Sequence, residues 1–195
     1  MGTGTVLLLI FVGVIFYGIS LYNRLIASRN GYKNAFAQID VQLTRRHDLI
    51  PNLIETAKGY MAHEKETLQA VIEARNSAVS GLGDVKVDPS NPDALQKLGE
   101  AERGLSGALG RLFALSESYP DLKANENMMQ LSEELTTTEN KLSFARQAFN
   151  DGVMLYNNLR EQFPSNLISD WFNFQPAQML ELEDVSMKQV PKVEF

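Results

Sequence analysis

The sequence predicts an all-α membrane protein: an N-terminal transmembrane helix that continues into an up-and-down bundle of three to four long helices with coiled-coil-like packing. Three observations predict this fold class: an uncharged apolar segment at the start, apolar residues at alternating spacings of three and four thereafter, and short connections rich in glycine, proline and aspartate. We divide the 195 residues into a transmembrane anchor at 1–23, a helical bundle at 24–163 and a C-terminal tail at 164–195.

The anchor is predicted from the segment Gly2–Asn23, which contains no charged side chain and consists mostly of Val, Leu, Ile, Phe and Gly. About 20 apolar residues in a helix are enough to cross the hydrocarbon layer of a bilayer. A cleaved signal peptide is the alternative, but Met1–Thr5 contain no basic residue, and bulky Leu21 and Tyr22 stand where cleavage requires small side chains. We therefore expect a retained anchor that binds membrane lipid.

The orientation of the anchor is predicted from the basic residues that follow it: Arg24, Arg29, Lys33, Arg45 and Arg46. Because positive charge is enriched on the cytoplasmic side of membrane spans, we expect the N-terminus outside and the bundle in the cytoplasm. The absence of cysteine from the sequence agrees with a reducing compartment. A net charge of −6 argues against a nucleic-acid partner, since such binding requires clustered positive charge.

Two apolar stripes predict two further helices. One stripe has no proline between Lys123 and Phe163, and a helix of that length is about 60 Å long at 1.5 Å per residue. The other runs from Ala94 to Leu115 and follows Asn91 and Pro92, which are typical residues of a helix N-terminus. Both stripes indicate helices that bury one face against neighbours.

The stretch Asn23–Ser80 carries a further stripe, which Pro51 interrupts. An interior proline removes a backbone hydrogen bond and crowds the preceding turn, so we expect a kink or a break near residues 48–51. The stripe keeps its register across Pro51, which favours a kink, giving one long helix packed with two others, over a reversal, which would give four antiparallel helices. Connections are predicted at Gly81–Asn91 and at Tyr119–Asp121.

The tail begins at Pro164, which is expected to end the last long helix. It contains an apolar cluster: Leu167, Ile168, Trp171, Phe172 and Phe174. We expect this cluster to fold back on the bundle, because exposed patches of this kind are uncommon on soluble monomers. The alternatives are docking on another subunit, on a partner or on the membrane, and the acidic residues Asp170, Glu181, Glu183 and Asp184 disfavour an anionic lipid surface.

We predict no catalytic, cofactor-binding or metal-binding residue. The two histidines, His47 and His63, each fall on a predicted helix. Thr67 stands where a zinc-protease helix starting at His63 would need its second histidine. His47 has no nucleophile that it could activate, so we expect an imidazole at the surface or at the edge of the bundle.

The acidic residues are interpreted as surface and turn groups. Glu133, Glu134 and Glu139 are expected to pair with Lys141 or Arg146 or to face water. Asp84 and Asp88 lack the ligand spacing of a calcium-binding loop, so we expect turn and cap roles for both.

Several segments together resemble bacterial LemA proteins. They are Tyr22-Asn23-Arg24-Leu25, Arg29-Asn30, Asp48 to Leu53, Gly59-Tyr60, His63-Glu64, Ala74-Arg75, Tyr119 to Asn127, Thr138 to Lys141, Tyr156-Asn157 and Phe163 to Leu167. The resemblance covers nearly the whole chain after the anchor. It implies a helical-bundle protein of the bacterial cell inner membrane with no established enzymatic activity. It also implies an association with the membrane zinc metalloprotease HtpX, and so a part in membrane-protein quality control or envelope stress.

The expected function is therefore a non-catalytic, membrane-anchored scaffold that forms a homo-oligomer and acts with a membrane protease. Gly13 and Gly18 support assembly in the membrane, because small residues let helices approach closely in lipid. Two alternatives remain: an enzyme subunit with an unrecognised site, and a protein that remodels membranes through Trp171 and Phe172.

Overall fold

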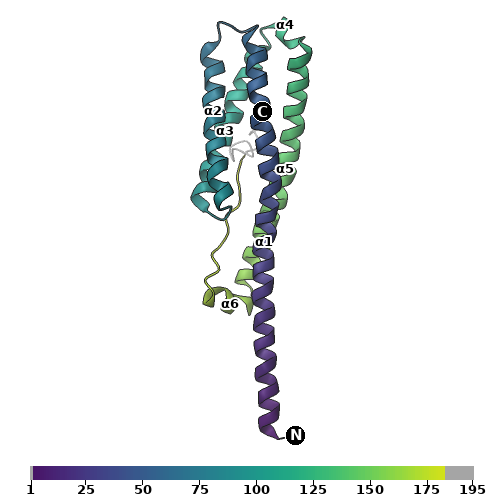
Figure 1. The fold of residues 1–195 in the computed structure, drawn as a ribbon, viewed down its shortest axis with the longest axis vertical. Coiled ribbons are helices and arrows are strands. Elements are labelled where there is room, and N and C mark those ends of the chain that lie inside the picture. The colour runs from purple at the N-terminus through teal and green to yellow at the C-terminus, as the bar shows by residue number, and fades with distance from the viewer. Residues whose placement is uncertain (1, 183–195) are drawn as a thin grey trace, which may run out of the picture.

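The computed structural model describes residues 2–182, which form six helices and their connections without a β-strand. In chain order the helices are α1 Thr3–Lys58, α2 Lys65–Val87, α3 Pro92–Ser116, α4 Pro120–Lys123, α5 Glu126–Glu161 and α6 Ser165–Trp171. Four of them, α1, α2, α3 and α5, run up and down side by side, and the N-terminal part of α1 extends far beyond the others (Figure 1). The predicted all-α bundle with a long N-terminal helix is confirmed.

α1 is one continuous helix with two different surfaces. Its N-terminal part exposes large apolar side chains, such as Leu7 and Phe16, which are 67% and 68% exposed. From Leu21 onward, residues at spacings of three and four are buried in the bundle. α1 contains a stretch long and apolar enough to cross a membrane, and only 6% of the 18 residues of its most apolar part are buried.

α1 continues through Pro51 and ends at Lys58, so the chain does not reverse at the proline. Pro51 lacks the N–H that would donate to the His47 carbonyl one turn earlier. The Arg75 side chain of α2 satisfies that carbonyl instead: its Nε donates to the His47 oxygen at 2.8 Å. This side-chain hydrogen bond replaces the missing backbone one and lets the helix accommodate an interior proline.

The predicted single helix from Asn23 to Ser80 is wrong beyond Lys58, because the chain reverses over residues 59–64 before α2 begins. The turn is closed by backbone bonds to the Ala57 carbonyl from the N–H groups of Tyr60 and Met61, at 3.0 and 2.9 Å. Met61 is fully buried, which holds the turn against the end of the bundle. The bundle therefore has four long helices, within the predicted three to four, and the favoured arrangement with three is wrong.

The helices predicted from the two apolar stripes are confirmed as α3 and α5, and α3 has the expected start. The Asn91 side chain accepts hydrogen bonds from the N–H groups of Asp93 and Ala94 at 3.0 and 3.2 Å, and Pro92 occupies the first turn of α3. The side chain of Asn125 caps α5 in the same way, accepting from the N–H of Met128 at 3.1 Å. The 36 residues of α5 span about 54 Å at 1.5 Å per residue.

Two glycines allow the backbones of neighbouring helices to approach closely. A Cβ at Gly152 of α5 would lie 3.1 Å from the Cβ of Tyr32 on α1. A Cβ at Gly81 of α2 would lie 3.3 Å from the Cα of Leu98 on α3. The predicted connection from Gly81 to Asn91 is therefore too long, because Gly81 is a packing position inside α2, and the helix continues to Val87.

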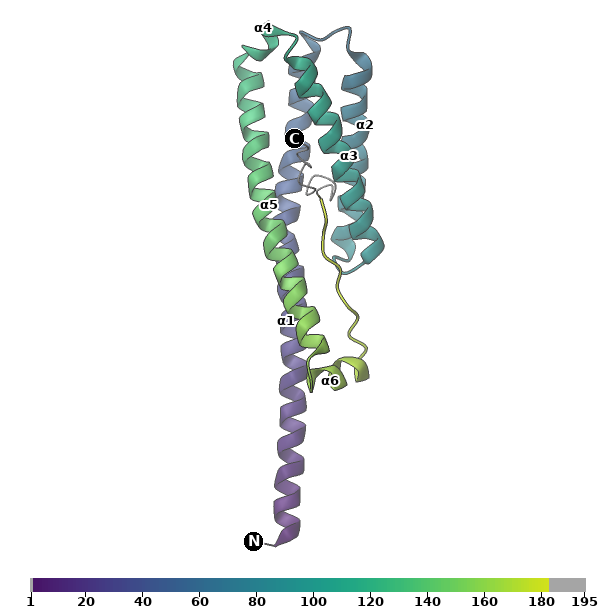
Figure 2. The same ribbon diagram turned by 180° about the vertical axis from the view of Figure 1, so that it is seen from behind.

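The bundle consists of two antiparallel pairs, α1 with α5 and α2 with α3, which α1 and α2 join (Figures 1 and 2). Its apolar core is divided into two clusters. The cluster nearer the N-terminal extension is centred on aromatic residues, among them Tyr32, Phe36 and Phe149, and the other is mainly aliphatic. On α1, α3 and α5, the positions between the two clusters carry polar side chains.

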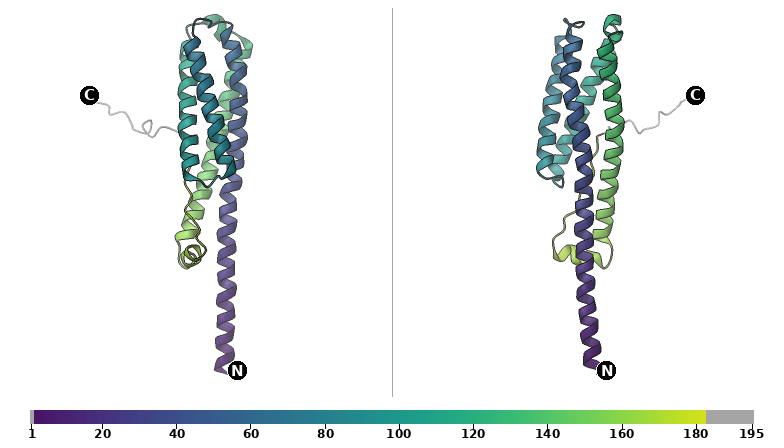
Figure 3. Two further views of the ribbon diagram at one scale, coloured as in Figure 1. Left: turned by 60° about the vertical axis from the view of Figure 1, so that its left-hand side comes forward. Right: turned by 45° about the vertical axis from the view of Figure 1, so that its right-hand side comes forward.

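The tail folds back only in part. α6 lies crosswise beside α1, near the point where α1 leaves the bundle (Figure 3), and the chain then runs back along the bundle toward residue 182. Phe174 is buried and Ile168 is half-buried, as predicted for a cluster that folds back. Leu167, Trp171 and Phe172 are exposed, so the prediction is wrong for these three side chains. Glu183 and Asp184 lie outside the described residues.

Candidate functional site

A buried polar layer separates the two apolar clusters. Arg46 and His47 of α1 and Glu102 of α3 are 5%, 2% and 1% exposed. The His47 Nε2 and a Glu102 oxygen lie 2.7 Å apart, and the Arg46 Nη1 lies 3.2 Å from the other oxygen. The prediction of a surface or edge position for His47 is therefore wrong. The signal lay in the spacing, because His47 occupies the stripe position between Leu43 and Ile50.

Arg46 extends the polar layer to α5 and toward solvent. Its Nη1 also lies 3.1 Å from a Glu139 oxygen of α5, and its Nη2 donates to the Ser106 hydroxyl at 2.8 Å. A buried charge is tolerated when it is paired and hydrogen-bonded, and Arg46 and His47 here share the Glu102 carboxylate. The layer thus links three helices at one level. Its groups are engaged with one another, and this geometry is that of a structural network.

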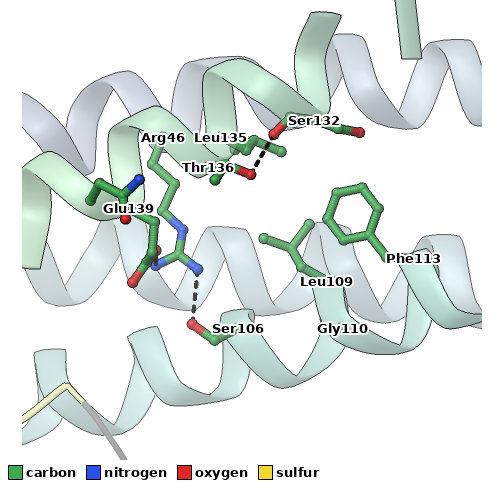
Figure 4. A pocket seen from close by; sticks show the side chains of 10 residues that line it. Arg46, Ser106, Leu109, Gly110, Phe113, Ser132, Leu135, Thr136 and Glu139 are labelled. Carbon is green, nitrogen blue, oxygen red and sulfur yellow. Dashed lines mark hydrogen bonds and ion pairs between the residues drawn. The ribbon is translucent and has the colours of Figure 1, made fainter. Parts of the chain in front are cut away.

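A groove between α3 and α5 opens beside the polar layer (Figure 4). The cavity has a volume of about 490 Å³ and a mostly apolar lining, to which α3 contributes Leu109 and Phe113 and α5 contributes Leu135. The Arg46 side chain reaches from α1 across to Ser106 at one end of the cavity. A concave apolar surface with one cation beside it is suited to binding, but it offers no activated nucleophile.

On the other side of the polar layer, the chain's own tail lies between α3 and α5 in an extended conformation. Asn157 of α5 donates to the Ala177 carbonyl at 2.8 Å and accepts from the Ala177 N–H at 3.0 Å. Asn150, two turns earlier, makes the same pair of bonds with Leu180, at 3.2 and 2.9 Å. The two asparagines therefore satisfy both backbone groups of two tail residues.

Further contacts from both α5 and α3 hold the tail in place. The Tyr156 hydroxyl of α5 donates to the Gln175 carbonyl at 2.7 Å, and Arg103 of α3 donates to the Glu181 carbonyl at 3.2 Å. A Cβ at Gly99 of α3 would lie 2.6 Å from that Glu181 oxygen, so only glycine leaves room for the tail there. Sequence reasoning missed this site. The available signal was a pair of asparagines seven residues apart, next to an apolar stripe.

Among the other acidic and histidine candidates, Glu139 lines the groove between α3 and α5. His63 is exposed in the turn after α1, so its predicted place on a helix is wrong. Glu134 lies 3.6 Å from Arg45 of α1, and Glu139 pairs with Arg46, partners that the sequence did not indicate. Within residues 2–182, no group of three or more His, Asp or Glu side chains is arranged to hold a metal ion.

The two aspartates before α3 have different roles. Asp88 follows the end of α2 and accepts from the Ser90 N–H at 3.0 Å, which confirms its predicted turn role. The Ser90 hydroxyl also donates to Asp88, and these bonds, with help from Lys33 at 3.4 Å, hold the pKa of the Asp88 carboxyl below its ordinary value. Asp84 lies inside α2 and is exposed, so its predicted turn role is wrong.

Comparison with known proteins gives one family. The sequence model of the LemA family matches residues 35–195. Protein LemA of Metamycoplasma hominis is 29% identical over 172 residues, which cover 88% of this chain and 70% of that protein. The magnetosome protein MamQ of Magnetospirillum gryphiswaldense is 24% identical over 209 residues, covering 91% of this chain and 76% of that protein. The magnetosome protein MamQ 2 of Paramagnetospirillum magneticum is 23% identical, with coverages of 82% and 64%.

Proposed function

The chain belongs to the LemA family, and from this premise we propose that it is a non-catalytic scaffold anchored in a membrane by the N-terminal part of α1. The proposal includes three finer statements: the bundle lies in the cytoplasm at the bacterial inner membrane, several copies assemble, and the assembly acts with a membrane zinc metalloprotease in membrane-protein quality control.

The single observation that carries this proposal is the continuity of α1. One helix exposes apolar side chains over its first turns and buries its apolar stripe in the bundle from Leu21 onward, with no break between the two parts. A helix that passes from lipid into a packed core cannot swing freely at the membrane surface. The bundle is therefore held at a defined position relative to the bilayer, which is the property that a scaffold requires.

The orientation is supported by Arg24 and the basic residues that follow it, and it can be tested with single cysteines. The natural sequence contains no cysteine, so each variant carries one thiol. We expect Gly2→Cys, just before α1, to react with a membrane-impermeant maleimide in intact spheroplasts, and Val87→Cys, at a residue that is 88% exposed, to react only after the membrane is opened. The reverse pattern would overturn the proposed orientation.

Assembly is supported by the exposed apolar surface of the N-terminal part of α1, where a Cβ at Gly13 would meet nothing within 4 Å. We expect full-length protein extracted in native nanodiscs to be larger than one copy by single-particle mass measurement, and to retain a membrane zinc metalloprotease. A strictly monomeric particle would count against assembly. Loss of the protease from an intact oligomer would count only against that partner.

A variant set separates the scaffold from an enzyme subunit. His63 and Glu139 are the appropriate targets because both are exposed; Glu139→Gln keeps an oxygen that can accept from Arg46, whereas changes at His47 or Glu102 would disrupt the buried part of the layer. We expect His63→Gln and Glu139→Gln to support the cellular phenotype of the natural protein. If either conservative change abolished the phenotype while the circular dichroism spectrum and melting temperature were unchanged, the scaffold would have to be abandoned in favour of chemistry at that residue.

A further inference from the structure

We propose that α6 is an interfacial helix, whose exposed aromatic face lies in the headgroup region of the leaflet from which α1 enters the bundle. The occupant of this face is thus the membrane surface itself. The inference rests on the proposed function, since it requires the N-terminal part of α1 to span the bilayer. It adds a second point of contact between the bundle and the membrane.

The first argument is the level of α6 along α1. A Cβ at Gly18 of α1 would lie 3.9 Å from the Ile168 Cδ1 of α6. The Tyr22 ring of α1 packs on the rings of Phe172 and Phe174, with centroid distances of 4.8 and 5.6 Å. α6 is therefore fixed beside residues 18–22 of α1.

The second argument is where the bilayer must lie on α1. A span of about 20 residues centred on the exposed apolar stretch Val6–Ile19 is Thr3–Tyr22, and residues 18–22 are its last turn. Moving the span one turn toward the bundle would bring the charged side chain of Arg24 into the hydrocarbon, which disfavours that placement. A span that ended before Gly18 would leave residues 18–22 among the headgroups. In each case α6 is at the boundary between lipid and water.

The third argument is the chemistry of the surface that α6 and its flanks expose. Phe163, Leu167, Trp171 and Phe172 are 79%, 58%, 83% and 56% exposed. Tryptophan and other aromatic rings favour the headgroup region, where the ring is shielded from water and a polar edge is still hydrated. α6 also lies crosswise to α1 (Figures 1 and 2), which is the orientation of a helix lying in the plane of a membrane.

The charges near α6 indicate which lipids matter. Asp170 is exposed on α6, whereas the exposed Glu161 at the end of α5 is paired with Arg160 at 2.9 Å, and the exposed Arg24 lies at the same boundary. Because charges of both signs occur here, the contact with lipid is expected to come from burial of the apolar side chains and not from attraction to anionic headgroups. We therefore expect the contact to form in purely zwitterionic bilayers.

The natural sequence provides a direct reporter, because Trp171 is its single tryptophan. The experiment uses full-length protein in phosphatidylcholine proteoliposomes that contain lipids brominated either near the headgroup end or near the methyl end of the acyl chain. We expect bromine to quench Trp171 fluorescence, more strongly from the headgroup end. An aqueous quencher such as acrylamide should have little effect.

Two matched variants, both carrying Trp171→Phe, serve as controls. Phe144→Trp places the reporter at a residue of α5 that is 73% exposed and about 26 Å along the helix from its end at Glu161. It should be quenched by acrylamide and not by bromolipid. Phe16→Trp places the reporter in the span and should be quenched several-fold more by bromolipid than the Phe144→Trp variant.

The outcomes separate the inference from the proposed function. If the Phe16→Trp reporter is quenched by bromolipid and Trp171 is not, the anchor stands and the interfacial helix is overturned, whether Trp171 is then open to acrylamide or covered by a second copy. If bromine at the methyl end quenches Trp171 more strongly, α6 is buried in the hydrocarbon and the interfacial position is wrong. If neither reporter is quenched, the proposed anchor itself fails.

Discussion

The hydrogen bond from Arg75 to the His47 carbonyl makes a specific prediction about Pro51. The carbonyl belongs to a residue that is 2% exposed, and the proline four residues later has no N–H to give it. A buried acceptor left without a donor costs about 1–3 kcal/mol. We therefore expect Arg75→Met, which keeps the aliphatic part of the side chain, to lower the free energy of unfolding by about 2 kcal/mol.

The same substitution should cost less when position 51 can donate. Pro51→Ala supplies a backbone N–H to the His47 carbonyl. By itself it should stabilise the fold by about 2 kcal/mol, the interior-proline cost of about 3 less about 1 for a freer unfolded chain. In that background we expect Arg75→Met to cost about 1 kcal/mol, which gives a coupling of about 1 kcal/mol in a double-mutant cycle.

The assay is urea unfolding of the full chain in a mild detergent, followed by far-ultraviolet circular dichroism. Arg111→Met, at an exposed arginine of α3, is the matched control and should change the free energy of unfolding by less than about 0.5 kcal/mol. Equal costs for Arg75→Met with proline and with alanine at position 51 would refute the reasoning, since the carbonyl would then not be what joins the two residues.

Three further predictions follow from the polar layer and the tail. Glu102→Ala should lower the free energy of unfolding by about 3 kcal/mol in the same urea assay, because it leaves the buried imidazole without its carboxylate and the buried guanidinium with Glu139 as its remaining carboxylate partner. Gly99→Ala places a Cβ 2.6 Å from a tail carbonyl and should speed amide hydrogen exchange in residues 175–182, whereas Gly104→Ala, with nothing within 4 Å, should not. Burial raises the pKa of Tyr156 above its ordinary value of about 10, so the natural protein should lose stability as the pH rises from that value through the folded-state pKa. The decline in melting temperature over this pH range should be shallower in Tyr156→Phe. An equal decline in the two proteins would contradict the role of Tyr156.

The helices that sequence reasoning predicted best are those whose signals are local. α3 and α5 were predicted from a continuous apolar stripe, and Asn91 and Pro92 marked the start of α3 correctly because capping depends only on neighbouring residues. Pro51 was read correctly as compatible with one helix. The true reversal after Lys58 was missed, since the turn at 59–64 has no proline and is held by burial of Met61, a tertiary effect.

The candidate site was much less accessible to sequence reasoning because each of its contacts joins residues far apart in the chain. The bond between His47 and Glu102 spans 55 residues, and the bond from Arg103 to the Glu181 carbonyl spans 78. A histidine among charged neighbours indicated a surface, but the register of α1 turned it inward. Only the packed helices show that Asn150 and Asn157 face an extended segment.

The unbroken helix α1 also sets the azimuth of the bundle in the membrane. At 3.6 residues per turn, each residue advances the helix by about 100°, so one residue inserted near Arg24 would rotate the entire bundle by about that angle relative to the lipid-facing side of the span. Seven inserted residues, close to two full turns, would restore the facing to within about 20° while raising the bundle by about 10 Å. Height above the bilayer and direction of facing are thus coupled through the length of a single rod, and any partner anchored in the same membrane meets one defined side of the bundle.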